Sequence, residues 1–252
     1  MDPCRPVIAV FSYGGIEGPT LDSYVNEMLA ATRAKIPLLQ TRVHGDALIS
    51  RSRSKALSGF LNLDPATANV FFMLDHDLEW DEGDILATCA KAHECQAIVG
   101  GIYSCRGFNM GHSGRFAKEE VTIKPGADVL HEAEFIGGGF VAIPRIVAEE
   151  VLKNGQGATA NGQGSNAFQN LALHECIYTD STSFYDFFRP VVVPGTLNPS
   201  DKRHEYLSED WSICWRARQA NPNRPQYLWS APVLRHWGSH GYTMATSPKK
   251  GA

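Results

Sequence analysis

Two aspartates at the end of a short apolar run are the residues of this chain best placed to do chemistry. Residues 70–74 read Val-Phe-Phe-Met-Leu, and Asp75 and Asp77 follow with one histidine between them. A run of this length with aromatic residues indicates a buried strand, and side chains alternate along a strand, so both carboxylates leave the core on the same side. Hard oxygen ligands in that place suit Mg²⁺ or Mn²⁺ carrying a diphosphate. An isolated Asp-x-Asp is equally typical of a solvated turn, so the neighbouring segments decide between the two interpretations.

Two further segments place charged residues at the predicted start of a helix. Arg51 and Arg53 alternate with serines, and arginine at a helix N-terminus is unfavourable for the helix dipole unless an anion lies nearby. The alternative is an exposed surface pair, or an ion pair between Arg51 and Asp46. Glu209 and Asp210 open a later predicted helix. The helix dipole stabilises carboxylates there, and a carboxylate in that position can also serve as a general base.

Three consecutive glycines and a late histidine complete the set of candidate residues. Gly137, Gly138 and Gly139 interrupt an apolar run over 135–143. Such glycines indicate either the close approach of a ligand or another backbone, or a β-bulge. His236 follows a predicted strand and can supply a nitrogen ligand to a metal, although most histidines are structural.

The first half of the chain, which must position these residues, alternates between strand and helix patterns. Such alternation predicts an α/β fold with a mostly parallel sheet, in which ligands bind at the carboxyl ends of the strands. Strands are predicted at 7–11, 38–43, 70–74 and 97–100, and helices at 20–34, 46–63 and 81–93.

The second half has a less regular pattern. Residues 153–166 are rich in Gly, Asn and Gln, which predicts a mobile loop or lid. This loop and an aromatic cluster at 184–188 are expected to shape a second binding site. The remaining predicted elements are a glycine-interrupted strand at 135–143, a helix at 145–152 and a helix at 208–220.

Composition excludes several classes of function. Of the 252 residues, 43% are hydrophobic and 20% charged, as in an ordinary globular protein with a core, and the net charge of −4 attracts neither nucleic acid nor an anionic membrane globally. The six cysteines form no Cys-x-x-Cys, which disfavours a zinc site. The N-terminus does not read as a signal peptide, and no apolar run approaches membrane-spanning length. We therefore expect a cytoplasmic protein with reduced thiols.

In their order and spacing, these segments resemble the GT-A-fold, nucleotide-sugar-dependent glycosyltransferases of the family 2-like type. The likeness implies a Rossmann-like three-layer αβα sandwich with a mostly parallel central sheet. It further implies one domain over 1–245, with a nucleotide-binding half at about 1–105, an acceptor half at about 106–245, and a flexible tail at 246–252. The motifs that carry the likeness are Phe11-Ser12-Tyr13-Gly14, the Ser-Arg-Ser-Arg-Ser segment at 50–54, Asp75-His76-Asp77, Ile136-Gly137-Gly138-Gly139-Phe140, Ser208-Glu209-Asp210 and His236.

The resemblance also implies a role for each candidate residue. Asp75, Asp77 and His236 would hold Mn²⁺ or Mg²⁺. Asp210 would be the general base, with Glu209 positioning it, and a base opposite the leaving group implies inverting transfer from a donor such as a UDP-sugar. The nucleotide sugar would contact Ser12, Tyr13, Gly14, Asp46, Arg51, Asp75, His76, Gly138 and Gly139.

The resemblance leaves the hydroxyl acceptor open among a glycan, a lipid-linked sugar, a protein and a modified DNA base. The negative net charge weighs against DNA. Two other functions are compatible with an α/β sheet and paired carboxylates. A nucleotidyltransferase is one, but no glycine-rich phosphate loop with a lysine follows the first strand. A catalytically inactive nucleotide-sugar-binding module is the other, and the intact set of Asp75, Asp77, Asp210 and His236 argues against it.

Overall fold

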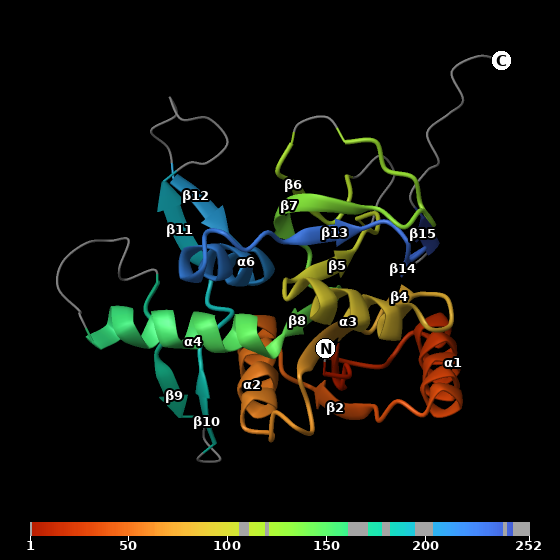
Figure 1. Cartoon of the computed structure of the whole chain (residues 1–252), viewed down its shortest axis with the longest axis horizontal. Helices are drawn as coiled ribbons and strands as arrows, with labels where there is room; N and C mark the ends of the chain where they lie inside the picture. Colours follow the sequence, from red (N-terminus) through yellow and green to blue (C-terminus); the bar gives the residue numbers. More distant parts are fainter. Residues whose placement is uncertain are drawn as a thin grey trace.

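A central sheet of eight strands carries the predicted alternation of strands and helices (Figure 1). The computed structural model describes residues 2–105, 111–118, 121–160, 171–177, 182–194, 204–238 and 241–243. Strands β7 and β8 run antiparallel to their neighbours, and the other six run in one direction, which confirms a mixed but mostly parallel sheet. The order across the sheet is β2 (Leu39–His44), β1 (Pro6–Ser12), β3 (Val70–Asp75), β8 (Phe140–Pro144), β5 (Val99–Gly101), β13 (Tyr227–Trp229), β7 (Leu130–Ile136) and β6 (Gly114–Phe116).

Helices cover both faces of this sheet, so the predicted three-layer αβα arrangement is confirmed. Alternation along β1 divides the core: Val7, Ala9 and Phe11 pack on one face, and Ile8 and Val10 on the other. The first face is covered by α2 (Ile49–Leu61), α4 (Arg145–Ala160) and α6 (Glu209–Ala220), and the second by α3 (Asp84–Cys95), with α1 (Gly18–Ala34) beside it.

Three small sheets complete the described fold. The one that concerns the site joins β4 to β14, and its register places His236 opposite Leu78, one residue after Asp77. Residues far apart in sequence therefore meet at the carboxyl end of β3. The small sheets are β10 (Ser183–Tyr185) with β9 (Glu175–Ile177), β11 (Val191–Pro194) with β12 (His204–Leu207), and β4 (Leu78–Glu79) with β14 (Arg235–Trp237) and β15 (Gly241–Thr243).

A buried arginine fixes the C-terminal end of α2, the helix that carries the Ser-Arg-Ser-Arg-Ser segment. Arg145, at the start of α4, donates to the carbonyl oxygens of Phe60 at 2.8 Å, Leu61 at 3.1 Å and Leu63 at 2.9 Å. Carbonyl groups at a helix end have no partner within the helix, and a cation there also opposes the negative end of the dipole. This contact ties the end of α2 to the start of α4.

The sequence-based elements of the first half are confirmed to within about three residues at each end, but three predictions for the second half are wrong. The apolar run 135–143 is not one strand. The glycines end β7 and turn the chain, and β8 then inserts between β3 and β5, far from β7 in the sheet order. The predicted loop is helical over 153–160, because α4 continues to Ala160; residues 161–166 lie outside the described residues.

The aromatic cluster at 184–188 also has a different place from the one expected. Phe187 and Phe188 are fully buried in the core beneath α2 and α6, rather than lining a binding site. The predicted tail at 246–252 lies outside the described residues. All six cysteines are free, and the helices within the described ranges include none long and apolar enough to cross a membrane.

Candidate functional site

A cavity opens at the carboxyl ends of β1 and β3, where ligands bind in open α/β sheets. Its volume is about 360 Å³, within the range of small-molecule sites. Of the nine residues predicted to contact a nucleotide sugar, four are absent from its lining: Gly14, Arg51, Gly138 and Gly139. The lining consists of Phe11, Ser12, Tyr13, Val43, Asp46, Ala47, Ile49, Ser52, Asp75, His76 and Asp77.

Arg51 forms an ion pair with Asp46, the alternative that the sequence left open. Its Nε donates to Oδ2 of Asp46 at 2.9 Å and its Nη2 to Oδ1 at 2.5 Å. This hydrogen bonding lowers the pKa of Asp46. Asp46 lines the cavity and Arg51 does not, so Arg51 orients the carboxylate of Asp46 rather than offering its own charge to a ligand.

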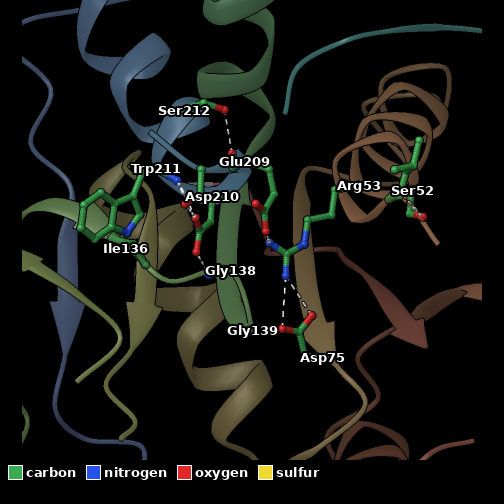
Figure 2. A network of polar contacts seen from close by, with 12 residues as sticks. Ser52, Arg53, Asp75, Ile136, Gly138, Gly139, Glu209, Asp210, Trp211 and Ser212 are labelled. Carbon is green, nitrogen blue, oxygen red and sulfur yellow. Dashed lines mark hydrogen bonds and ion pairs between the residues drawn. The ribbon is translucent and has the colours of Figure 1, made fainter. Parts of the chain in front are cut away.

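Arg53 lies at the centre of the site. The sequence indicated an anion near Arg51 and Arg53, but the resemblance gave Arg53 no role. Its Nη2 donates to both oxygens of Asp75, at 2.9 and 3.2 Å, and its Nη1 donates to Oε1 of Glu209 at 3.2 Å. Figure 2 shows the guanidinium between these two carboxylates, which come from β3 and α6. The residue is only 3% exposed. Two acidic groups predicted from separate motifs are therefore joined through one buried cation.

Charges at this point perturb one another strongly. Burial by itself lowers the pKa of Arg53, but the negative charges around it, that of Asp75 foremost, raise the pKa above its ordinary value. Burial raises the pKa of Glu209, the charge of Asp210 raises it further, and Arg53 lowers it. Perturbed groups gathered beside a cavity are typical of functional sites.

The glycine turn leaves room for protein side chains. A Cβ on Gly138 would lie 2.1 Å from Nη1 of Arg53, and a Cβ on Gly139 would lie 2.7 Å from the hydroxyl oxygen of Tyr103. The backbone N–H of Gly139 donates to that oxygen at 3.0 Å. The sequence predicted that Gly138 and Gly139 admit the donor sugar or the acceptor, but within the described residues their open faces are occupied by Arg53 and Tyr103.

Asp210 is held on the other side of the same turn. The N–H of Gly138 donates to its Oδ2 at 3.2 Å, and the N–H of Trp211 donates to its Oδ1 at 2.9 Å. The hydroxyl of Ser208 also donates to Oδ1. The N–H of Asp75 in turn donates to the carbonyl of Gly139 at 2.9 Å. The adjacent residues Gly138 and Gly139 therefore link Asp210 to Asp75, which lines the cavity.

Asp77 and His236 form a second pair beside the cavity. Nε2 of His236 lies 3.5 Å from Oδ2 of Asp77, and Nδ1 lies 3.1 Å from the carbonyl oxygen of Ser104. A carbonyl only accepts, so Nδ1 carries a proton, and Nε2 faces the carboxylate. A histidine fixed in this way is typical of metal ligands, and ligands about 2.1 Å from one ion lie about 3 to 3.5 Å apart.

The predicted set of three metal ligands does not come together in the structure. Within the described part of the chain, no group of three or more His, Cys, Asp or Glu side chains could hold a metal. Asp75 is directed to Arg53 instead, which leaves Asp77 and His236 as the pair that fits an ion. Two protein ligands make a weak site unless a ligand such as a diphosphate supplies further oxygens.

Comparison with known proteins supports the fold assignment but gives no information on the reaction. No family model and no curated protein matches the sequence. The chain is similar to the crystal structure of A197 from STIV, with a TM-score of 0.52 and 17% identity, over 93% of this chain and 86% of that one. A synthase of 4-diphosphocytidyl-2C-methyl-D-erythritol from Anaerococcus prevotii matches with a TM-score of 0.33 and 13% identity, over 67% and 81% of the two chains. The first likeness shows a shared fold alone, and the second is too weak to support more.

Proposed function

We propose that this chain is a metal-dependent glycosyltransferase that moves a sugar from a nucleoside-diphosphate sugar to a hydroxyl acceptor. One observation supports this above the others. Asp75 and Asp77 line a cavity of small-molecule size, and Asp210 is held by the glycine turn that also accepts a hydrogen bond from the backbone N–H of Asp75. A donor in the cavity would therefore have carboxylates at its diphosphate that can bind it through a divalent cation, and a third carboxylate, that of Asp210, beyond the glycine turn.

In this proposal the cavity binds the nucleoside between the strand ends and the start of α2. Its volume of about 360 Å³ is at the low end for ligand sites, which favours a pyrimidine base and hence a UDP-sugar. Asp77 and His236 would hold Mn²⁺ or Mg²⁺ together with the diphosphate. Such an ion supplies electrostatic stabilisation of the negative charge that develops on the leaving group.

Asp210 would take the proton of the acceptor hydroxyl as that oxygen attacks the anomeric carbon. Its two oxygens accept hydrogen bonds from Ser208, Trp211 and Gly138, which orient the carboxylate. A base held on the side away from the departing diphosphate implies a single displacement with inversion.

The six free thiols are in keeping with a reducing cytoplasm.

A panel of nucleotide sugars with Mn²⁺ tests the proposal. We expect slow release of nucleoside diphosphate from one donor without any acceptor, because water can replace the acceptor hydroxyl. A nucleotidyltransferase would instead release pyrophosphate from a nucleoside triphosphate and a sugar phosphate. Saturable binding of a nucleotide sugar with no turnover of any kind would identify an inactive binding module.

A further inference from the structure

The contacts of Arg53 join the two halves of the candidate site. Asp75 lies on the cavity side and Glu209 on the side of Asp210, and Arg53 donates to both carboxylates from a side chain only 4% exposed. In the described ranges it is the one cation within ion-pair distance of either group. Removing one partner of a buried ion pair costs far more than an exposed pair is worth, because a buried charge is left uncompensated.

The surrounding backbone is shaped to seat this guanidinium. Gly138 has no side chain at the point where a Cβ would lie 2.1 Å from Nη1 and 2.6 Å from Cζ of Arg53. The same glycine donates its N–H to Asp210. Arg53 therefore packs against Gly138, the residue that hydrogen-bonds Asp210. A displacement of Arg53 would move Gly138 and, through it, Asp210.

We propose that Arg53 is a positioning residue that keeps Glu209 ionised and apart from Asp210, so that Asp210 stays free to accept a proton. This inference rests on the proposed role of Asp210 in glycosyl transfer. Without the guanidinium, Glu209 and Asp210 would be adjacent carboxylates in a poorly solvated site, and adjacent carboxylates tend to share a proton. A shared proton would occupy the group that must receive the one from the acceptor.

The charged and titratable groups around Glu209 and Asp210 come from α2, β3, α6 and the segment that follows β5. Arg53 on α2 and Asp75 on β3 face Glu209, and the charge of Asp210 also raises its pKa. Around Asp210, the buried hydroxyl of Tyr103 and the thiols of Cys105 and Cys214 have pKa values that burial raises, so they remain neutral near pH 7. Arg53 is thus the group whose removal changes the charge felt by both carboxylates.

Carbon-13 NMR of the side-chain carboxyls tests this in the free protein, with no need for turnover. The titration midpoint of Glu209 should rise by about 1 to 3 pH units in Arg53→Met, the usual effect of losing a close opposite charge. Arg53→Lys retains the charge and should keep the midpoint near that of the wild type. An unchanged midpoint in a folded Arg53→Met variant would overturn the proposal.

A second variant keeps the test decisive if Arg53→Met does not fold. Arg53→Gln combined with Asp75→Asn removes a buried positive and negative charge together, which costs less stability than breaking the pair. Because the charge of Asp75 itself raises the pKa of Glu209, the reference for this variant is Asp75→Asn alone. The midpoint of Glu209 should be higher in the double variant than in Asp75→Asn. Equal midpoints in these two variants would show that Arg53 does not control Glu209, and the inference would be wrong.

Kinetics separate this inference from the proposed function. On a donor that the wild type turns over, kcat of Arg53→Met should fall at least about tenfold more at pH 5.5 than at pH 8, because the base is protonated at the lower pH. Adding Glu209→Gln should restore the profile toward that of Glu209→Gln alone. If the wild type turns over no nucleotide sugar, the proposed function is contradicted, and the NMR titration still tests the role of Arg53. If the wild type is active but the titration midpoint of Glu209 is unchanged in Arg53→Met, only the inference about Arg53 is contradicted.

Discussion

The guanidinium of Arg53 donates to both carboxylate oxygens of Asp75, at 2.9 and 3.2 Å, so the first aspartate of the Asp-x-Asp segment is engaged by the protein itself. The second aspartate, Asp77, is 5% exposed and lies beside His236. The two carboxylates therefore have different partners, although they leave the same strand. We expect them to respond differently to a metal ion and to substitution.

Metal binding should depend on Asp77 and require a nucleoside diphosphate. Two protein ligands make a weak site, and the phosphates supply the missing oxygens. Titration calorimetry should show no tight Mn²⁺ binding alone, binding in the presence of UDP, and loss of that binding in Asp77→Asn. The exposed Asp81→Asn serves as the matched control. Tight binding of Mn²⁺ without nucleotide that survives Asp77→Asn would rule out this site.

Asp210→Asn should reduce kcat by about 10²- to 10⁴-fold, the usual contribution of a general base. The amide preserves size and most hydrogen bonding, so the dissociation constant of the nucleotide sugar should stay nearly unchanged. Asp77→Asn should weaken donor binding as well, which provides the contrast. If Asp210→Asn retains most of its transfer activity, Asp210 only opens α6, and Glu209 becomes the next candidate for the base.

Gly138→Ala should displace Arg53, because the added Cβ would lie 2.1 Å from its Nη1. We expect kcat to fall and the titration midpoint of Glu209 to rise, as in Arg53→Met. Gly59→Ala is the matched control: it lies exposed within α2, and a Cβ there meets nothing within 4 Å. That substitution should stabilise the protein by up to about 1 kcal/mol through helix propensity. Equal activity in the two variants would show that the seat of Arg53 tolerates a side chain.

Stability should depend on the protonation of Asp84. Burial raises the pKa of Asp84 to about 6, so the folded protein favours the neutral acid. The folded pKa exceeds the unfolded one. The resulting stability is therefore present below about pH 4 and is lost as the pH rises through about 6. The free energy of unfolding of the wild type, relative to Asp84→Asn, should fall over this interval in urea titrations. A difference in the free energy of unfolding that does not change with pH would contradict this prediction. Asp22 is exposed, and Asp22→Asn serves as the control variant.

The sequence predicts the nucleotide-side half of the fold well because its elements have strong local signals. The apolar runs that form β1 and β3 are bounded by polar residues, and the helices between them carry regular apolar spacing. The run at 135–143 failed because three glycines can mark either a bulge or a turn, and only the sheet order decides. The continuation of α4 was missed because Gly155 is buried against Leu173, a packing reason for glycine that composition does not reveal.

The sequence predicted which residues lie at the candidate site better than it predicted the contacts between them. Ser12, Tyr13, Asp46 and His76 line the cavity as expected, but the roles of Arg51 and Arg53 could not be separated. Two residues apart on a helix, they point in different directions, one to the rim and one into the core. Which one is buried depends on how α2 packs against the sheet, and the local sequence does not reveal that packing.

Phosphorus NMR of a nucleotide sugar incubated with Mn²⁺ and the protein tests the central claim most directly. The wild type should produce the terminal β-phosphate signal of a nucleoside diphosphate, and Asp77→Asn should produce it far more slowly at the same donor concentration. Formation of nucleoside monophosphate instead would contradict transfer at the anomeric carbon. Nucleoside diphosphate released at the same rate by Asp77→Asn would contradict the placement of the reaction in this cavity.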